Sequence, residues 1–174
     1  YIAFVGDNNQ VAIDSGGNIF VAGWTGYTYF PITPSAYDSS YNGNADAFVS
    51  KLNSNLTSLL SSTFLGGLGV NGNESGRSIA IDSGGNVFVV GETDSSGYPA
   101  TPGAYDTSYT YSSDEREGYE VLISKFDNSL SYLLSSTFLG GSKSDYGDSV
   151  AIDSADNIFV TGTTYSLNFP TTPG

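Results

Sequence analysis

The 174-residue sequence contains no cysteine, no histidine and no methionine, and only five of its residues are lysine or arginine. Without cysteine there is no disulfide, and without cysteine and histidine there is no Ser-His-Asp or Cys-His catalysis and no zinc, haem or iron–sulfur site built on those ligands. The 18 acidic residues give a formal net charge of −13, which disfavours nucleic acids and anionic lipid surfaces as partners. No run of about 18 apolar residues occurs either, so we expect no membrane insertion.

What the sequence does contain is a motif that occurs three times: VAIDSGGNIFVAG at 11–23, IAIDSGGNVFVVG at 79–91 and VAIDSADNIFVTG at 150–162. Each copy is an apolar, β-rich run, a polar turn and a second such run, which predicts a β-hairpin. In the turn, Asp14 or Asp82 can accept backbone N–H groups while a glycine takes a positive φ. The third copy lacks these glycines, so we expect Asn157 to take that conformation. Internal repeats indicate an array of similar units.

The first two hairpins are followed by the same elements in the same order. A loop with two prolines cannot lie in a central strand, and two further apolar runs, the second closed by Gly-Gly, predict a third and a fourth strand. Four strands per repeat indicate a β-propeller blade, and consecutive apolar residues require that both faces of each sheet be covered. The loops lie at 30–38 and 99–106, the third strands at 46–52 and 120–126, and the fourth strands at 59–65 and 133–139.

We therefore predict an all-β protein of about two and a half blades, each a four-stranded antiparallel sheet, with repeats at approximately 11–78, 79–149 and 150–174. Propellers close with roughly four to eight blades, so this array forms an incomplete ring with bare strand edges. We expect that residues 1–174 are part of a larger propeller or that neighbouring chains complete it. The start at Tyr1, with no signal peptide visible, suggests a processed protein or a piece of a longer one.

Several motifs in this order resemble the bacterial β-propeller repeat family known as SBBP. They are the hairpin VAIDSGGNIFVAG, the loop FPITPSAYD, the strands DAFVSKLN and LLSSTFLGG, and the final stretch SDYGDSVAIDSADNIFVTGTTYSLNFPTTPG. The resemblance covers nearly the whole chain. It implies a propeller of a kind found in secreted or cell-surface proteins, and it implies no catalytic residue, because the family is defined by structural repeat positions.

Carboxylates are the remaining route to chemistry or metal binding. Glycoside hydrolysis needs only two carboxyl groups at a suitable separation, and Ca²⁺ binds oxygen ligands from Asp, Asn and backbone carbonyls. No pair stands out, and for each acid a solvated turn or loop position is the alternative. Besides the acidic insertion at 114–117, the candidate carboxylates and calcium ligands are Asp7, Asp46, Asp145 and Asp148.

Aromatic residues near the proline loops are candidates for stacking on sugar rings or for gripping another protein. Tyr37 and Tyr105 occupy matching repeat positions, so we expect them to fill the groove between blades instead. Lys51 and Lys125 also match, and we expect them to be outer-strand residues with snorkelling stems rather than catalytic amines. The candidate ligand-binding residues are Trp24, Tyr109, Tyr111 and Tyr119.

We expect a secreted or cell-surface, non-enzymatic module without a cofactor, although Ca²⁺ is possible. It would serve as a structural scaffold or an adhesive surface, with other subunits or the remainder of a longer chain as partners. The alternative is a carbohydrate-binding or carbohydrate-active propeller with glycans as ligands. The first hypothesis predicts exposed rim aromatics and contacts to neighbouring chains, whereas the second predicts that acidic and aromatic side chains converge in one pocket.

Overall fold

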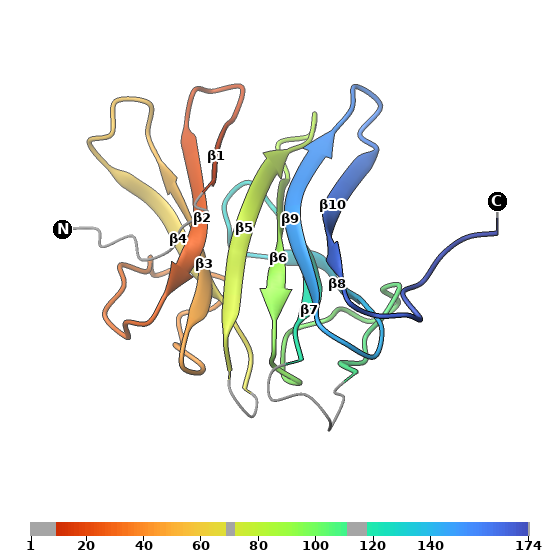
Figure 1. Cartoon of the computed structure of the whole chain (residues 1–174). Coiled ribbons are helices and arrows are strands. Elements are labelled where there is room, and N and C mark those ends of the chain that lie inside the picture. Colours follow the sequence, from red (N-terminus) through yellow and green to blue (C-terminus); the bar gives the residue numbers. More distant parts are fainter. Residues whose placement is uncertain (1–9, 69–71, 111–117, 174) are drawn as a thin grey trace.

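The computed structural model describes residues 10–68, 72–110 and 118–173. Within these ranges the chain forms ten β-strands in three sheets and contains no helix, and therefore no helix with the length and apolar character of a membrane span. Figure 1 shows the sheets side by side, with β5 and β6 in the middle. The all-β prediction is confirmed, and no sheet closes into a ring. The predicted strands form sheets because their β-branched and aromatic residues suit a pleated surface covered on both faces.

Within each sheet, every strand pairs antiparallel with the next strand in the chain, so each sheet is a simple meander, here called a blade. Blade 1 consists of β1 (Gln10–Ile13), β2 (Ile19–Thr25), β3 (Asp46–Leu52) and β4 (Leu59–Leu65). Blade 2 consists of β5 (Glu74–Ile81), β6 (Val87–Thr93), β7 (Glu120–Phe126) and β8 (Leu133–Leu139). Blade 3 has only β9 (Asp145–Ile152) and β10 (Ile158–Thr164).

The predicted third and fourth strands of blades 1 and 2 are confirmed with the predicted bounds. The blades stack face to face, and their first strands β1, β5 and β9 contact one another in sequence. Val89 and Val90 are adjacent in β6, yet Val89 belongs to the core shared with blade 1 and Val90 to the core shared with blade 3. Both faces of blade 2 are therefore buried, which explains its unbroken apolar run.

The free face of blade 1 is covered in part by its own proline loop. The ring of Phe30 lies 4.3 Å from that of Phe48, centroid to centroid, and 6.2 Å from that of Phe64. Val11 and Ile13 on β1 are 57% and 65% exposed, since no blade precedes them in the part of the chain that the structure describes. This end of the array is therefore open at its inner strand.

Each proline loop runs along the outermost strand of its blade. The backbone N–H of Thr33 donates to the carbonyl of Ser62 at 3.2 Å, and Ser62 N–H donates back to the Thr33 hydroxyl at 3.0 Å. Further along, Phe64 N–H donates to the carbonyl of Asp38 at 3.0 Å. Strand β4 therefore has partners on its outer side although no fifth strand exists. The same bonds join Thr101 to Ser136 and Phe138 to Asp106 in blade 2. We call these two loop segments, residues 33–38 and 101–106, the edge straps.

The hairpin turns follow the prediction in blades 1 and 2 but not in blade 3. Asp14 Oδ1 accepts the N–H of Asn18 at 2.9 Å, and Gly17 has a φ of 78°. In blade 3 the prediction of a positive φ at Asn157 is wrong, because Asp156 has a φ of 61° instead. The Asp156 carboxylate accepts the Ser83 N–H at 2.9 Å. That bond to the turn of the neighbouring blade offsets the cost of the left-handed conformation.

Candidate functional site

The three blades differ most at the outer edge of their second strand. In blade 1 all of β2 pairs with β3, and in blade 2 all of β6 pairs with β7. Strand β10 pairs with β9 alone within the described ranges. Phe20 and Phe88, at matching positions, are 0% and 5% exposed, whereas Phe159 is 58% exposed. We call β10 with its unpaired backbone the open edge.

In blades 1 and 2 the neighbouring strand brings a lysine to the hairpin turn. Lys51 Nζ lies 3.2 Å from Asp14 Oδ2 and 4.9 Å from the centroid of the Phe20 ring. Lys125 repeats both contacts in blade 2, at 3.0 Å from Asp82 and 4.8 Å from Phe88. Both lysines lie on the third strand, as the sequence predicts, but this is not the outermost strand, because the fourth strand pairs with it on its outer side.

These ion pairs are reflected in the acidity of the turn aspartates. Burial would raise the pKa of Asp14, but hydrogen bonds from Asn18 and the charge of Lys51 outweigh it and lower the pKa to about 2. Asp153 holds the same turn in blade 3 with bonds from Ala155 and Asn157. It is exposed, and it forms no ion pair with a lysine among the described residues.

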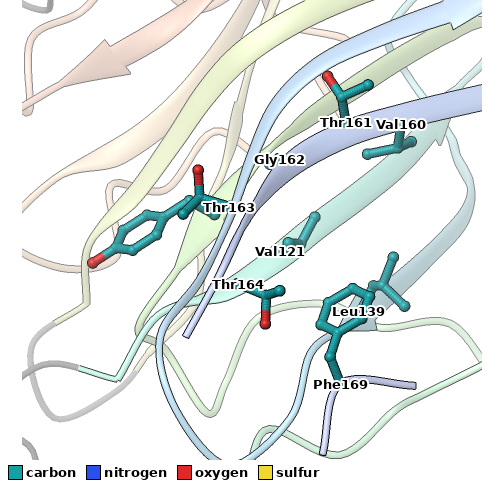
Figure 2. A pocket seen from close by; sticks show the side chains of 10 residues that line it. Val121, Leu139, Val160, Thr161, Gly162, Thr163, Thr164 and Phe169 are labelled. Carbon is teal, nitrogen blue, oxygen red and sulfur yellow. The ribbon is translucent and has the colours of Figure 1, made fainter. Parts of the chain in front are cut away.

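Beside the open edge lies an apolar hollow of about 180 Å³. Figure 2 shows Val121 and Leu139 of blade 2 together with Val160 and Phe169 of blade 3 around it. Three threonines of β10 and Tyr146 of β9 are the polar residues of its lining, and no aspartate or glutamate lines it. The hollow suits an apolar side chain better than a charged or sugar ligand.

The prediction for the matching tyrosines holds for one of the two. The ring of Tyr37 lies 5.7 Å from that of Phe126 in the next blade, and its N–H donates to the Leu130 carbonyl at 2.9 Å. Tyr37 thus fills the groove between blades 1 and 2. For Tyr105 the prediction is wrong, since its side chain is 70% exposed. The described part of blade 3 contains no third strand against which it could pack.

The aromatic residues proposed as ligand contacts do not gather in one place. Tyr109 packs against Phe138 of its own blade, and its hydroxyl donates to a backbone carbonyl. Tyr119 packs against Tyr146 of blade 3, with 5.5 Å between ring centroids. Trp24 lies on β2 of blade 1, half-buried, and Tyr111 lies outside the described residues.

The four aspartates proposed as calcium ligands lie at separate places. Asp46 and Asp145 are both fully buried, but they begin strands of different blades. Asp148 is half-exposed and lies 3.6 Å from the Arg77 guanidinium, which also pairs with Glu92. Asp7, like the acidic insertion at 114–117, lies outside the described ranges. Within those ranges no three His, Cys, Asp or Glu residues form a group that could hold a metal ion.

Asp46 and Asp145 belong instead to a pair of buried carboxylates at each blade junction. Glu74 is 1% exposed and interacts electrostatically with Asp46; Glu120 is 2% exposed and interacts in the same way with Asp145. Each of the four carboxyl groups has one oxygen bonded to a protein donor and one buried oxygen without a hydrogen-bond partner.

Burial raises the pKa of Glu74, Glu120 and Asp46. It raises the pKa of both Glu74 and Glu120 to about 7, and the neighbouring carboxylate of each pair acts in the same direction. Asp46 reaches about 6 for the same reason. Near neutral pH, Glu74 and Glu120 are therefore protonated part of the time, and the unpartnered oxygens of the four junction acids are the atoms that a cation would meet.

The residues of the open edge were not singled out from the sequence. Asp153, Phe159 and Phe169 have counterparts in the first two repeats, but their role depends on a strand that is missing beside them. One signal was present in the sequence: a turn aspartate is matched by a third-strand lysine in two repeats, and the third repeat has the aspartate alone.

Comparison with known proteins bears on the blade architecture. A family model described as SBBP, Beta-propeller repeat, matches residues 66–99 and 133–170. The first stretch covers the β5–β6 hairpin and the second covers β8 with the β9–β10 hairpin. A search of curated proteins found no match. With two four-stranded sheets and one two-stranded sheet in sequential order, the chain has the architecture of a partial β-propeller, and two of its stretches match the SBBP beta-propeller repeat.

Proposed function

We propose that this chain is a non-enzymatic interaction module of the cell exterior, a propeller segment whose open blades are completed by other propeller elements. The observation that carries the proposal is the contrast between Phe159, which is 58% exposed, and its counterparts Phe20 and Phe88, which are buried in blades that have a third strand and a following blade beside them. A large aromatic residue beside an unpaired strand edge is a site of association. The location follows from the SBBP resemblance.

The opposite end of the array supports the same role. Val11 on β1 is 57% exposed, whereas its counterparts Ile79 and Val150 are 5% and 8% exposed against a neighbouring blade. Both ends thus present surfaces of a kind that is buried between the blades. The carbohydrate hypothesis has no comparable support, because the hollow contains no carboxylate and the proposed aromatic residues lie apart.

The oligomeric state of the native protein tests the proposal. We expect light scattering to show a mass above that of one 174-residue chain, from self-association, a longer polypeptide or a bound partner. Assays on oligosaccharides and a glycan array should both be silent. A stable monomer of this length that binds no protein would contradict the interaction role, and turnover of a glycan would contradict the non-enzymatic one. Protease treatment of intact cells tests the location, since an exterior protein is degraded.

A further inference from the structure

We infer that the open edge of blade 3 binds a β-hairpin of defined chemistry, whose first strand has a large apolar residue, a lysine three positions later and an apolar residue directly after the lysine. The inference rests on the proposed function and specifies the partner of that module. It follows from three sets of contacts that blades 1 and 2 contain in full and blade 3 contains in part. Each set assigns one position of the partner.

The apolar position follows from a cluster of four residues. In blade 1 the cluster consists of Val21, Phe30, Phe48 and Phe64, and in blade 2 the matching residues are Val89, Tyr98, Leu122 and Phe138. Blade 3 supplies only the first two members, Val160 and Phe169, and both line the hollow. The missing members belong to a third and a fourth strand, so a hairpin is required rather than a single strand.

Strand register places the missing apolar residue at the hollow. Phe48 is the register partner of Gly23 on β2, and Leu122 is the register partner of Gly91 on β6. The matching residue on β10 is Gly162, which lines the hollow. A strand paired with β10 in this register therefore places its apolar side chain in the space between Val160, Phe169 and blade 2.

The lysine position follows from the same register. Lys51 pairs with Phe20 and Lys125 pairs with Phe88, and each lysine reaches the turn aspartate of its blade. On β10 the matching position is Phe159, whose exposed ring lies in the same repeat as Asp153. A partner lysine there would be held by the aspartate and by the face of the aromatic ring.

The position after the lysine is assigned by the exposed tyrosine of blade 2. Leu52 and Phe126 follow their lysines directly, and Phe126 is the residue against which Tyr37 packs. By the same repeat relation, Tyr105 would pack against the residue that follows the partner's lysine. The absence of this contact in the described structure accounts for the 70% exposure of Tyr105.

A second copy of this chain is not the partner that the structure favours. Within the described ranges the two third strands, Asp46–Leu52 and Glu120–Phe126, have the required pattern, and both are fully paired inside their own blades. A second copy could donate one of them only by unfolding a blade. The partner is therefore a hairpin from outside residues 1–174, in a longer polypeptide or in another protein, with the same chemistry.

The test uses the intact chain and a synthetic peptide with the sequence of residues 46–65, which contains β3, its turn and β4. Binding is measured by isothermal titration calorimetry. We expect the peptide change Phe48→Ala to weaken binding about thirtyfold or more, because it empties the hollow. The peptide change Lys51→Gln and the protein change Asp153→Asn should each weaken binding about five- to tenfold.

A double-mutant cycle then tests whether Lys51 of the peptide meets Asp153. If they do, the Lys51→Gln peptide binds the Asp153→Asn protein no more weakly than it binds the native chain, because either change already removes the contact. Asp148→Asn is the matched control, since it removes the same charge from the first strand of blade 3. It should leave the affinity unchanged.

The outcomes separate this inference from the proposed function. Peptide binding with independent, additive effects of the two changes would refute the assigned register and leave the interaction role intact. No peptide binding, together with self-association that Phe159→Ser abolishes, would replace the hairpin with a second copy. No peptide binding by a chain that remains a monomer and captures no protein would overturn both.

Discussion

Blades 2 and 3 begin with similar hairpins, whose second strands read VFVVGET in β6 and IFVTGTT in β10. Side chains at matching positions of these two strands nevertheless have different surroundings. The first strands of the two blades are buried to a similar degree, since Ile79 and Val150 are 5% and 8% exposed. On the second strands they differ, with Phe88 at 5% and Phe159 at 58%. Burial of the first strand thus depends on the preceding blade, whereas Phe20 and Phe88 on the second strands are covered by a third-strand lysine and, for Phe20, by the core shared with the following blade.

We expect the largest difference in stability between alanine substitutions of Phe88 and Phe159. Phe88→Ala should lower the free energy of unfolding by about 3–5 kcal/mol, because it leaves a cavity in a complete blade. Phe159→Ala should lower it by less than about 1 kcal/mol, since the ring is already exposed. Urea denaturation of both variants measures the difference. Equal losses would show that Phe159 is buried in solution and would remove the contrast between the blades.

We expect the buried carboxylates at the two blade junctions to make the stability of the protein depend on pH. The pKa of Glu74 and that of Glu120 are raised from 4.5 to about 7. A raised carboxyl pKa means that the folded state binds the proton more tightly than the unfolded state, so the stabilisation is complete below pH 4.5 and is lost as the pH rises through about 7. Each glutamate contributes at most about 3 kcal/mol to this loss.

Unfolding in urea at several pH values between 5 and 8 checks this prediction. Glu74→Gln and Glu120→Gln should each flatten the pH profile and raise stability at pH 8, because the amide carries no charge to bury. Stability that increases with pH would contradict the assignment. If the junctions bind Ca²⁺ instead, added Ca²⁺ should restore the stability of the native chain at pH 8 and should not affect a variant with both glutamates replaced.

The turn ion pairs give a smaller contrast. Lys125→Gln should cost roughly 1–2 kcal/mol, because the lysine pairs with Asp82 and covers the Phe88 ring. Asp153→Asn should change stability by less than about 0.5 kcal/mol, since it has no lysine partner in the described structure. Thermal melts of the two variants measure this, and a large loss for Asp153→Asn would indicate that its partner is already in place.

The smallest effect is expected in the hairpin turns. Gly85 has a φ of 82°, so Gly85→Ala should cost about 1 kcal/mol. Asp156→Gly in blade 3 removes a strained φ of 61° but also the bond to Ser83, so the two effects should nearly cancel. Chemical denaturation resolves the two changes. Equal losses would mean that the Ser83 bond dominates in blade 3.

The strands and their order could be predicted from the sequence because they depend on local patterns. Both third strands, for example 46–52, carry unbroken apolar runs between polar turns, and these mark the bounds without tertiary information. The backbone conformation of Asp156 could not be predicted from such local patterns. Its positive φ depends on Ser83, which lies 73 residues away in the chain.

The open edge and the carboxylate pairs escaped prediction for a related reason. Asp46 begins a predicted strand and Glu74 begins β5, but the local pattern does not reveal that both are buried at the junction of two blades. Lys51 looks like an exposed strand residue, but its partner Asp14 belongs to a turn two strands earlier. Such contacts arise only when the third strand folds back beside the second.

The edge straps also determine how assemblies of this chain can grow. Because backbone groups of Ser62 and Phe64 on β4 are already bonded to residues 33–38, no foreign strand can add to that side of blade 1, and β8 is shielded in the same way. The addition of further strands to the outer edge, which would lead to amyloid-like stacking, is therefore prevented in the two four-stranded blades. Growth is therefore directed along the circumference, to the exposed face of blade 1 and to the unfinished blade 3, rather than outward from β4 or β8.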